Sequence, residues 1–349
     1  MRHRLGSVID RHYASCFRPE AIVSVDSSQS FSGAELYRVE TPSGSFCLRG
    51  WPPNSLPLVR IRGLHQLLLH LFASGMTQVA VPLPTIAGAT TFEWENRVWH
   101  LEPWMPGVAD FRGDPQPEKL ANAMIALAEW HRAAANWNAP DDCSQWFGVS
   151  AAAPSPAALE RLARFNEWDG ENLAVLRARI HVSAPSGWRE TGTRFLSHFE
   201  RLTKIVRDEL QRFESVLLPL QPCLRDIWSE HVLFTGTKVT GLIDPTACRI
   251  DHVAVDLARL LGSFLDDDIA SWKFALQAYQ QYHPLSDIEL EYVRVLDRSS
   301  TLLSGMNWLG RYFLQGSIIG NPESALKRLV NLTKRIENIN NTSRPVISK

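Results

Sequence analysis

Apolar residues in the first hundred positions follow a strand-like pattern with one helical interruption. Short β-branched or alternating segments are separated by the polar stretches SSQSFSG and TPSG, which favour turns. Residues 58–73 (LVRIRGLHQLLLHLFA) instead place leucines on one helical stripe that ends before Gly75. We therefore expect an antiparallel sheet with one inserted helix, after a short helix at 6–17. The expected strands are 21–25, 34–39, 45–51, 79–88 and 90–104.

The pattern becomes helical after the segment Met105-Pro106-Gly107, with a small β-hairpin around 230–244. This order predicts an α+β protein with a two-lobed layout. We expect a first lobe over 1–104, a mainly helical second lobe over 105–338, and a flexible tail over 339–349. The expected helices are 117–137, 155–182, 189–215, 256–265, 271–282, 285–314 and 322–339.

Composition narrows the class of partners. The 349 residues are 45% hydrophobic and 21% charged, which is typical of a globular chain, and the formal net charge is −1. This charge balance predicts no nucleic-acid partner. The sequence contains no apolar run of about 18 residues, so we expect no membrane-spanning helix. The five cysteines are odd in number and never in CxxC spacing, which favours reduced thiols in a cytoplasmic protein.

Two carboxylates flank the predicted hairpin. Asp226 lies in the loop of CLRDIWSEHVLF (223–234), and Asp244 ends the strand of GLIDP. Phosphoryl transfer uses one carboxylate to orient an acceptor hydroxyl and another to hold Mg²⁺ against phosphates. Spacing alone leaves open an ordinary hairpin with two surface aspartates.

Longer motifs resemble the aminoglycoside phosphotransferase family of the protein-kinase-like superfamily. LRDIWSEHVLF, GLIDP and VDLARLLGSF follow in the family's order and spacing, and ALAEWHRA is similar to its L-A-x-x-H helix. FSGAELYRV with SFCLRGW, and VWHLEPWMPG, resemble its nucleotide-covering hairpin and inter-lobe connector. The resemblance implies a two-lobed kinase-like fold, with ATP and Mg²⁺ as cofactors and a small-molecule hydroxyl as acceptor.

The resemblance also implies roles for single residues. Asp226 would be the catalytic base, Asp244 the Mg²⁺ ligand, and Asp256 a structural cap rather than a catalyst. The backbone of the connector from Glu102 to Trp104 would meet the adenine. The loop over the phosphates would consist of Ser30, Phe31, Ser32 and Gly33.

Three positions depart from the family pattern. Leu224 replaces a scaffolding His, and His231 replaces an Asn that helps to hold metal, although Mg²⁺ prefers oxygen ligands. Arg49 stands where the family has a phosphate-binding Lys, and it can grip phosphate in bidentate fashion. No acidic residue lies between Glu40 and Glu93, so the helix at 58–73 has no carboxylate to pair with it. Its remaining polar partners would be His65, Gln66 or the phosphates themselves.

Other polar residues are open to a structural as well as a functional interpretation. His131 falls on the apolar stripe of its helix and is interpreted as a core residue. Asp266, Asp267 and Asp268 are either a solvated helix end or a site for a cationic substrate. His65, His70 and His100 lack metal-site spacing and are interpreted as non-metal residues.

The sequence thus predicts an ATP- and Mg²⁺-dependent small-molecule kinase. In it, Arg49 contacts the phosphates, Asp244 holds Mg²⁺, His231 assists metal or phosphate, and Asp226 orients the acceptor. The alternative is a pseudokinase that binds nucleotide or a partner without transferring phosphate. A third hypothesis is a binding module for a cationic metabolite.

Overall fold

The computed structural model describes residues 2–25, 33–168, 170–183, 185–315 and 322–341. By its contacts the chain divides into two compact units, and each unit contains residues from separated parts of the sequence. The first unit comprises residues 1–149 and 229–248, and the second comprises 150–228 and 249–349. The expected lobe boundary after residue 104 and the expected tail stay predictions.

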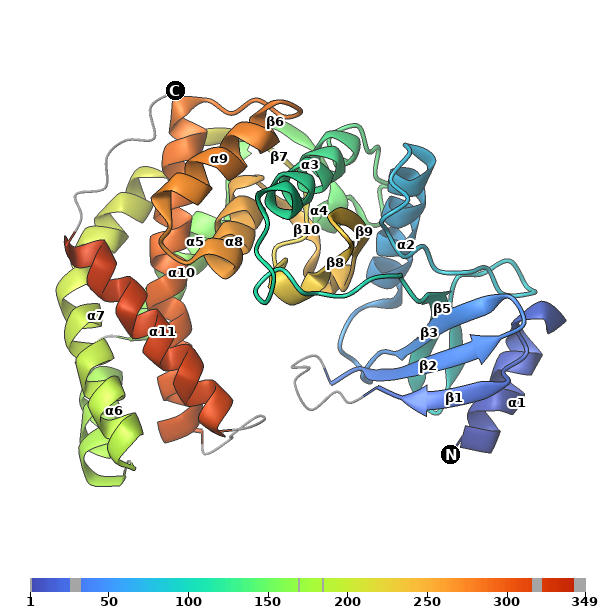
Figure 1. Cartoon of the computed structure of the whole chain (residues 1–349), viewed down its shortest axis with the longest axis horizontal. Coiled ribbons are helices and arrows are strands. Elements are labelled where there is room, and N and C mark those ends of the chain that lie inside the picture. The colour runs from blue at the N-terminus through green and yellow to red at the C-terminus, as the bar shows by residue number, and fades with distance from the viewer. Residues whose placement is uncertain (1, 26–32, 169, 184, 316–321, 342–349) are drawn as a thin grey trace. The chain divides into compact units, whose positions relative to one another are not determined.

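The first unit is built on an antiparallel sheet with strand order β1-β2-β3-β5-β4 (Figure 1). Its strands are β1 (Ala21–Ser24), β2 (Glu35–Thr41), β3 (Gly44–Gly50), β4 (Phe92–Trp94) and β5 (Arg97–Pro103). The helix α1 (Arg2–His12) covers one face of the sheet. Its apolar side chains form a cluster with those of the strands, including Ile9, Val39, Leu48 and Leu101.

The other face of β3 and β5 carries the polar side chains. The register pairs Cys47 with Glu102 and Arg49 with His100. Successive side chains of a strand point to opposite faces, so these four lie on the face that α1 does not cover. The strand alternation therefore separates an apolar core from a polar, potentially functional surface.

The hairpin that carries Asp244 belongs to this first unit. It consists of β8 (Val232–Thr235) and β9 (Lys238–Leu242), preceded by the 3-10 helix η2 (Ser229–His231) and followed by η3 (Pro245–Ala247). An isolated bridge joins Val79 to Leu242, and a second joins Val108 to Phe234. The other helical elements of this unit are η1 (Ser15–Phe17), α2 (Leu58–Ala73), α3 (Pro117–Ala134) and α4 (Ser144–Phe147).

A glycine lets the segment after β5 pass close to this hairpin. Gly107 has φ of 102°, and a Cβ there would lie 2.4 Å from Thr240 Oγ1 and 2.6 Å from the carbonyl oxygen of Phe234. The Thr240 hydroxyl also donates to the carbonyl of Pro106 at 2.6 Å. Any side chain at position 107 would therefore displace the hairpin.

Two sequence predictions of secondary structure are wrong. Residues 79–88 form no strand, because Pro82 and Pro84 have no N–H for a ladder, and only single bonds such as Leu83 N–H to Leu101 O (2.7 Å) tie the segment to the sheet. The single helix expected over 155–182 is two helices, α5 (Pro156–Asn166) and α6 (Gly170–Ser183).

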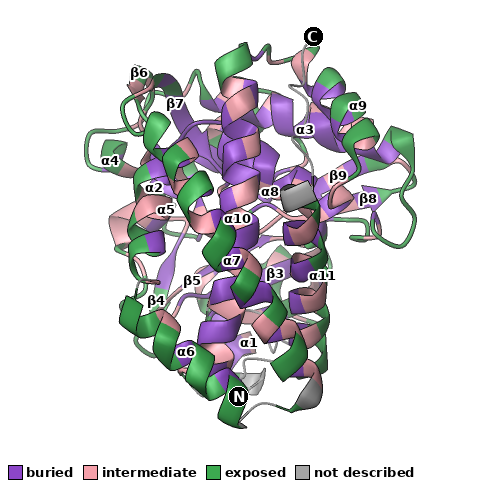
Figure 2. Ribbon diagram, turned by 90° about the vertical axis from the view of Figure 1, so that its left-hand side faces the viewer, coloured by how far each residue is buried: buried purple, intermediate pink, exposed green. Residues whose placement is uncertain are grey.

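The second unit contains most of the long helices and a sheet of order β10-β7-β6. Its strands are β6 (Ser150–Pro154), β7 (Leu217–Cys223) and β10 (Arg249–Asp251). Its remaining helices are α7 (Ser186–Arg212), α8 (Ala254–Leu265), α9 (Ile269–Gln280), α10 (Asp287–Phe313) and α11 (Pro322–Asn341). The helix α10 is buried along much of its length, whereas α6 is largely exposed (Figure 2).

The α+β class, with an antiparallel sheet early in the chain and a mainly helical remainder, is confirmed. The helices expected at 58–73, 256–265, 271–282, 285–314 and 322–339 are present within a few residues. Among the described residues, no helix is long and apolar enough to cross a membrane.

The start of α10 gives a prediction about acid stability. Glu289 accepts hydrogen bonds from the Ser286 backbone (2.7 Å) and hydroxyl (2.6 Å), and its other oxygen lies 2.9 Å from His252 Nε2. Burial alone would raise the pKa of Glu289, but these partners outweigh it and lower the pKa to about 2. A carboxyl whose pKa is depressed on folding stabilises the protein above its unfolded pKa, and that contribution is lost as the pH falls towards 2.

We therefore expect Glu289→Gln to lower the free energy of unfolding by about 2 kcal/mol at pH 7. The deficit relative to the wild type should shrink as the pH falls from about 5 towards 2. Urea denaturation across this range measures it. The control is Glu291→Gln, whose partner Arg212 is 63% exposed, and its effect should be below about 1 kcal/mol. A deficit that does not change with pH would contradict this assignment.

Candidate active site

Asp244 ends the hairpin in a constrained backbone conformation. Its φ and ψ are 57° and 58°, the left-handed region, which aspartate tolerates better than most residues. The side chain is 31% exposed, and its Oδ1 lies 3.1 Å from Nη1 of Arg49 on β3. The fold thus brings together two of the residues that the sequence predicted for the phosphate and metal site.

Arg49 has a second carboxylate partner, which comes from the neighbouring strand. Its Nε lies 3.5 Å from Oε1 of Glu102 on β5, and both side chains are about nine-tenths buried. From the sequence we predicted only a backbone role for Glu102. An acidic partner of Arg49 was expected from the helix at 58–73, which contains no carboxylate. A strand in register with β3 supplies that partner instead.

Two more side chains extend this network on the same sheet. Trp51 Nε1 donates to Nδ1 of His100 at 3.1 Å. The proton of a neutral His100 therefore lies on Nε2, which is 3.3 Å from Oε2 of Glu102. Hydrogen bonds and ion pairs thus run from Trp51 through His100, Glu102 and Arg49 to Asp244.

Charge in this buried network sets the protonation of its members. Burial alone would raise the pKa of Glu102, but Arg49 and His100 outweigh it and lower the pKa below its usual range. Burial works against the Arg49 cation, yet Asp244 and Glu102 raise its pKa. Glu102 is therefore an anion and Arg49 a cation, and both carboxylates constrain the guanidinium.

The partners that the sequence suggested for Arg49 have other contacts. His65 is buried, and its Nδ1 lies 2.8 Å from Thr90 Oγ1. Its ring packs edge-on against that of His100, with the ring centroids 4.6 Å apart. Burial, followed by His100 and Arg49, lowers the pKa of His65 well below its usual range, so this ring is neutral. Gln66 is exposed on α2. Among the described residues, the charged partners of Arg49 are Glu102 and Asp244.

His231 lies at the base of the hairpin, close to Asp244 in the ladder. Its carbonyl accepts the Ile243 N–H at 3.0 Å, and the register continues from the Val232–Leu242 pair. The residue is half-buried. Pairing across the hairpin therefore places His231 beside the strand end that carries Asp244.

The predicted nucleotide loop and connector are only partly described. Ser30, Phe31 and Ser32 lie outside the described residues, whereas Gly33 has φ of 65°. In the connector, the Trp104 N–H donates to the Ser45 carbonyl at 3.0 Å, so it is already used. These roles stay predictions.

The second unit presents Asp226 in an exposed loop after β7. Its side chain is 54% exposed, and Arg259 of α8 donates to Oδ1 from Nη2 at 2.9 Å and from Nε at 3.2 Å. The backbone of this loop is held by Asp256, which is fully buried. Its carboxylate accepts the backbone N–H groups of Leu224 (2.7 Å) and Arg225 (2.5 Å). Asp256 therefore has a structural role, in which it braces the backbone of the Asp226 loop.

Arg225 fixes the loop from its other side. It has φ of 64°, and its guanidinium reaches Asp251 at 3.1 Å and Glu160 at 2.5 Å. Asp251 is fully buried and accepts the Ser155 hydroxyl at 2.5 Å. These ion pairs hold the backbone on which Asp226 is displayed.

The acidic run 266–268 has structural partners in the second unit. Asp268 caps α9 through the N–H groups of Ala270 and Ser271, and Asp267 lies 3.3 Å from Arg335 Nε. Asp266 ends α8, and its carbonyl accepts the Trp272 indole N–H. The substrate role of this run stays a prediction, and its described contacts favour the helix-end interpretation.

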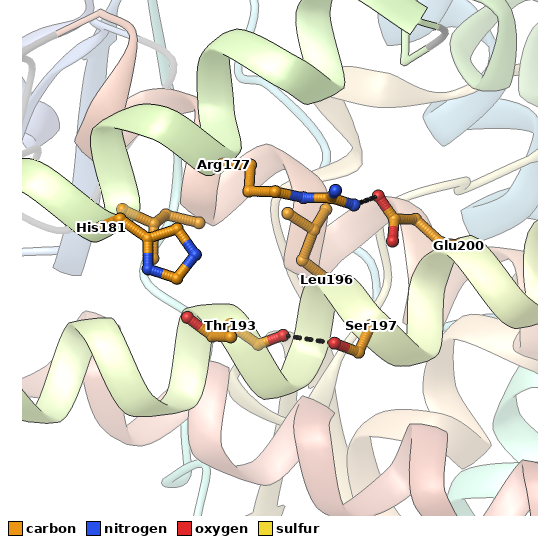
Figure 3. Close-up of a pocket in the computed structure, with 7 residues that line it drawn as sticks. Arg177, His181, Thr193, Leu196, Ser197 and Glu200 are labelled. Atoms are coloured by element: carbon orange, nitrogen blue, oxygen red, sulfur yellow. Dashed lines mark hydrogen bonds and ion pairs between the residues drawn. The ribbon is translucent and has the colours of Figure 1, made fainter.

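Two further features lie apart from these residues. His131 is completely buried in α3, in agreement with its interpretation as a core residue. A cavity of about 310 Å³ lies between α6 and α7, where Arg177 ion-pairs with Glu200 and His181 faces the opening (Figure 3). It contains none of the residues predicted for catalysis.

Comparison with known proteins identifies the class and then the family. Solved structures with small-molecule kinase folds superpose over nearly the whole chain. An amicoumacin kinase gives a TM-score of 0.68 at 13% identity, covering 97% of this chain and 93% of that one. An aminoglycoside phosphotransferase from Alicyclobacillus acidocaldarius gives 0.65 at 15% identity, covering 93% and 91%. A spectinomycin phosphotransferase gives 0.62 at 13% identity, covering 98% and 99%.

The model of the phosphotransferase enzyme family (APH) matches residues 29–287. The chain belongs to this family, and its fold is that of the aminoglycoside phosphotransferases. A homoserine kinase of Agrobacterium fabrum is 27% identical over 136 residues, and one of Rhizobium johnstonii is 26% identical over 145. These matches span 42% and 44% of the length of those curated relatives, and 36% and 38% of this chain.

Proposed function

We propose that the protein transfers the γ-phosphoryl group of ATP to a hydroxyl of a small molecule. The observation that carries the proposal is the buried arrangement of Arg49 between Glu102 and Asp244. A guanidinium held by two carboxylates is a rigid cation suited to phosphate oxygens, whose charge must be neutralised during phosphoryl transfer. Family membership supports the same reaction class.

The side chains fit the cofactors that the family implies. Asp244 offers a hard carboxylate oxygen, the ligand type that Mg²⁺ prefers, and His231 offers a weaker nitrogen ligand nearby. Bound Mg²⁺ would shield the phosphate charge. The ion pair of Asp244 with Arg49 orients its carboxylate for that role.

Asp226 is proposed to orient the acceptor hydroxyl and to accept its proton. It is exposed on a loop whose backbone Asp256 and Arg225 hold in place, so it is accessible and well positioned. The names of the related proteins point to different acceptors, including homoserine, spectinomycin and amicoumacin. We therefore define the acceptor at this stage only as a small molecule with a hydroxyl group.

A second candidate is a pseudokinase that binds nucleotide without transfer. Two observations favour it: His231 replaces an oxygen ligand, and both key carboxylates are ion-paired, Asp244 with Arg49 and Asp226 with Arg259. For catalysis, each ion pair would have to open, or its carboxylate would have to bind the metal or the acceptor as well as the arginine.

Thermal unfolding with ATP, with and without Mg²⁺, tests the proposal. We expect ATP at 100 times its dissociation constant to add about 2.7 kcal/mol of stability, with a larger shift when Mg²⁺ is present. In Asp244→Ala the Mg²⁺-dependent part should disappear. The matched control, Asp208→Ala, removes an exposed aspartate of α7 and should leave the shift unchanged. A shift without Mg²⁺ dependence would favour the pseudokinase.

A further inference from the structure

The surroundings of Asp226 are positively charged and aromatic. Arg259 contacts its carboxylate directly. Trp228 follows two residues later, so its backbone lies within about 7 Å of that of Asp226. The Cζ atom of Arg328 on α11 lies over two indole rings, 5.5 Å from the ring centroid of Trp228 and 5.6 Å from that of Trp308 on α10.

These two arginines differ in how their charge is balanced. Arg259 has Asp226 as its carboxylate partner, and its Nε and Nη2 both donate to Oδ1. Arg328 forms no ion pair within the part of the chain that the structure describes, although it is half-buried and lies over two indole rings. The aromatic faces stabilise this cation, and a guanidinium presents its N–H groups at the edge of its plane. The cluster therefore has more positive than negative charge.

The acidic residues that could attract a cation have other partners in the same unit. Asp267 pairs with Arg335, and Asp268 caps α9. Glu160 pairs with Arg225 and Arg249. A polycationic acceptor would therefore meet arginines beside Asp226, and like charges in contact disfavour binding.

We propose that the acceptor is an anionic hydroxy compound, a hydroxy acid or hydroxy amino acid, whose carboxylate binds Arg259. Arg328 supplies a second positive charge, and Trp228 and Trp308 provide an apolar wall. This inference rests on the proposed function, because it takes Asp226 as the residue that orients the hydroxyl.

Geometry limits the size of this acceptor. A hydroxyl bound to Asp226 lies about 2.6–3.2 Å from a carboxylate oxygen. Arg259 Nη2 lies 2.9 Å from Oδ1 of the same side chain. A hydroxyl bonded to Oδ1 therefore lies at most about 6 Å from Nη2, and a carboxylate oxygen bonded to that nitrogen lies at most about 9 Å from the hydroxyl, given hydrogen bonds of ordinary length. Hydroxy acids with two to four carbon atoms between the two groups fall within that limit.

The test compares acids with their neutral amides on the purified full chain. The pairs are L-homoserine and its carboxamide, 3-hydroxypropanoate and 3-hydroxypropanamide, and 4-hydroxybutanoate and 4-hydroxybutanamide, with choline and kanamycin as cationic probes. Calorimetry in the presence of Mg²⁺ and a non-hydrolysable ATP analogue measures binding, and ADP release measures turnover. For at least one pair we expect the acid to bind at least tenfold more tightly than its amide.

Variants assign the effect to the arginines. Arg259→Gln should weaken the acid at least tenfold while changing the affinity for the amide by less than twofold, and Arg259→Lys should restore part of the difference. Arg328→Gln should weaken the acid by a smaller factor. Arg212→Gln, an exposed arginine of α7 that is paired with Glu291, is the control and should change neither affinity.

The outcomes separate this inference from the proposed function. Equal binding of acid and amide in every pair, including no binding of either, overturns the inference, as does phosphorylation of choline or kanamycin in preference to the acids. Binding of an acid that depends on Arg259, without ADP release or nucleotide binding, supports the anion site and refutes the kinase. Phosphorylation of a cationic acceptor supports the kinase and refutes the anion site.

Discussion

Replacing Asp226 by asparagine is expected to slow phosphoryl transfer by about 10²–10⁴-fold, the range for loss of a positioned general base. Asparagine keeps the size of the side chain and can still accept a hydrogen bond, but it cannot take up the proton of the acceptor hydroxyl. The side chain is 54% exposed, so the fold should tolerate the change. The ion pair of Arg49 with Asp244 does not involve this residue, and the affinity for Mg·ATP should stay within about twofold.

The measurement is ADP release with the acceptor that gives the highest wild-type rate, together with calorimetric binding of Mg·ATP. Asp208→Asn serves as the control, because that aspartate is exposed and is ion-paired with Lys204 of the same helix, α7. A variant Asp226→Asn that turns over ATP at the wild-type rate would remove Asp226 from the mechanism. Loss of nucleotide binding in the same variant would instead indicate a structural role.

The second large effect is expected at Glu102. Glu102→Gln leaves the cation of Arg49 buried with one carboxylate in place of two, and breaking a buried pair in this way is strongly destabilising. Because Asp244 still contacts Arg49 at 3.1 Å, we expect the lower end of the usual range, about 3 kcal/mol of unfolding free energy. The affinity for Mg·ATP should fall as well, since Arg49 then depends on Asp244, the residue proposed for the metal.

A double-mutant cycle separates the pair from its surroundings. Arg49→Met combined with Glu102→Leu removes both charges and fills the space with apolar atoms, so much of the lost stability should return. Nucleotide binding should not return, because the phosphate-binding cation is absent. Urea denaturation and calorimetry of the four proteins give the two quantities. Additive losses of stability would show that Arg49 and Glu102 do not interact.

Sequence patterns predicted the main elements of the fold well where the signal is local. The leucine stripe of 58–73 gave the bounds of α2, and the turn residues between the first three strands separated β1, β2 and β3 correctly. The segment 79–88 was misread, because its apolar residues resemble a strand although two prolines prevent a ladder. The strand β6 was not predicted, since SAAAP has little strand propensity and is held by pairing with β7.

In the candidate site, the sequence predicted the residues but did not predict which of them are in contact. Asp226, Asp244, Arg49 and His231 were predicted as site residues from their motif positions alone. The partner of Arg49 was sought one helix away, where no carboxylate exists. Glu102 was missed as that partner because the pairing of β3 with β5 makes Arg49 and Glu102 diagonal neighbours although they are 53 positions apart, and no local pattern encodes that register.

The sequence by itself therefore determined the class of protein, the order of its elements and the candidate residues for phosphoryl transfer, because these depend on local periodicity and on motifs. Only the tertiary structure decided which charges meet. It placed Glu102 and Asp244 against Arg49, and Asp256 against the backbone of the Asp226 loop. It also placed Arg259 on Asp226 and Arg328 over two tryptophan rings. Burial makes the pairing of Arg49 with Glu102 and the contacts of Asp256 selective, since an ion without a partner in a protein interior costs several kcal/mol, and burial is a property of the packed chain.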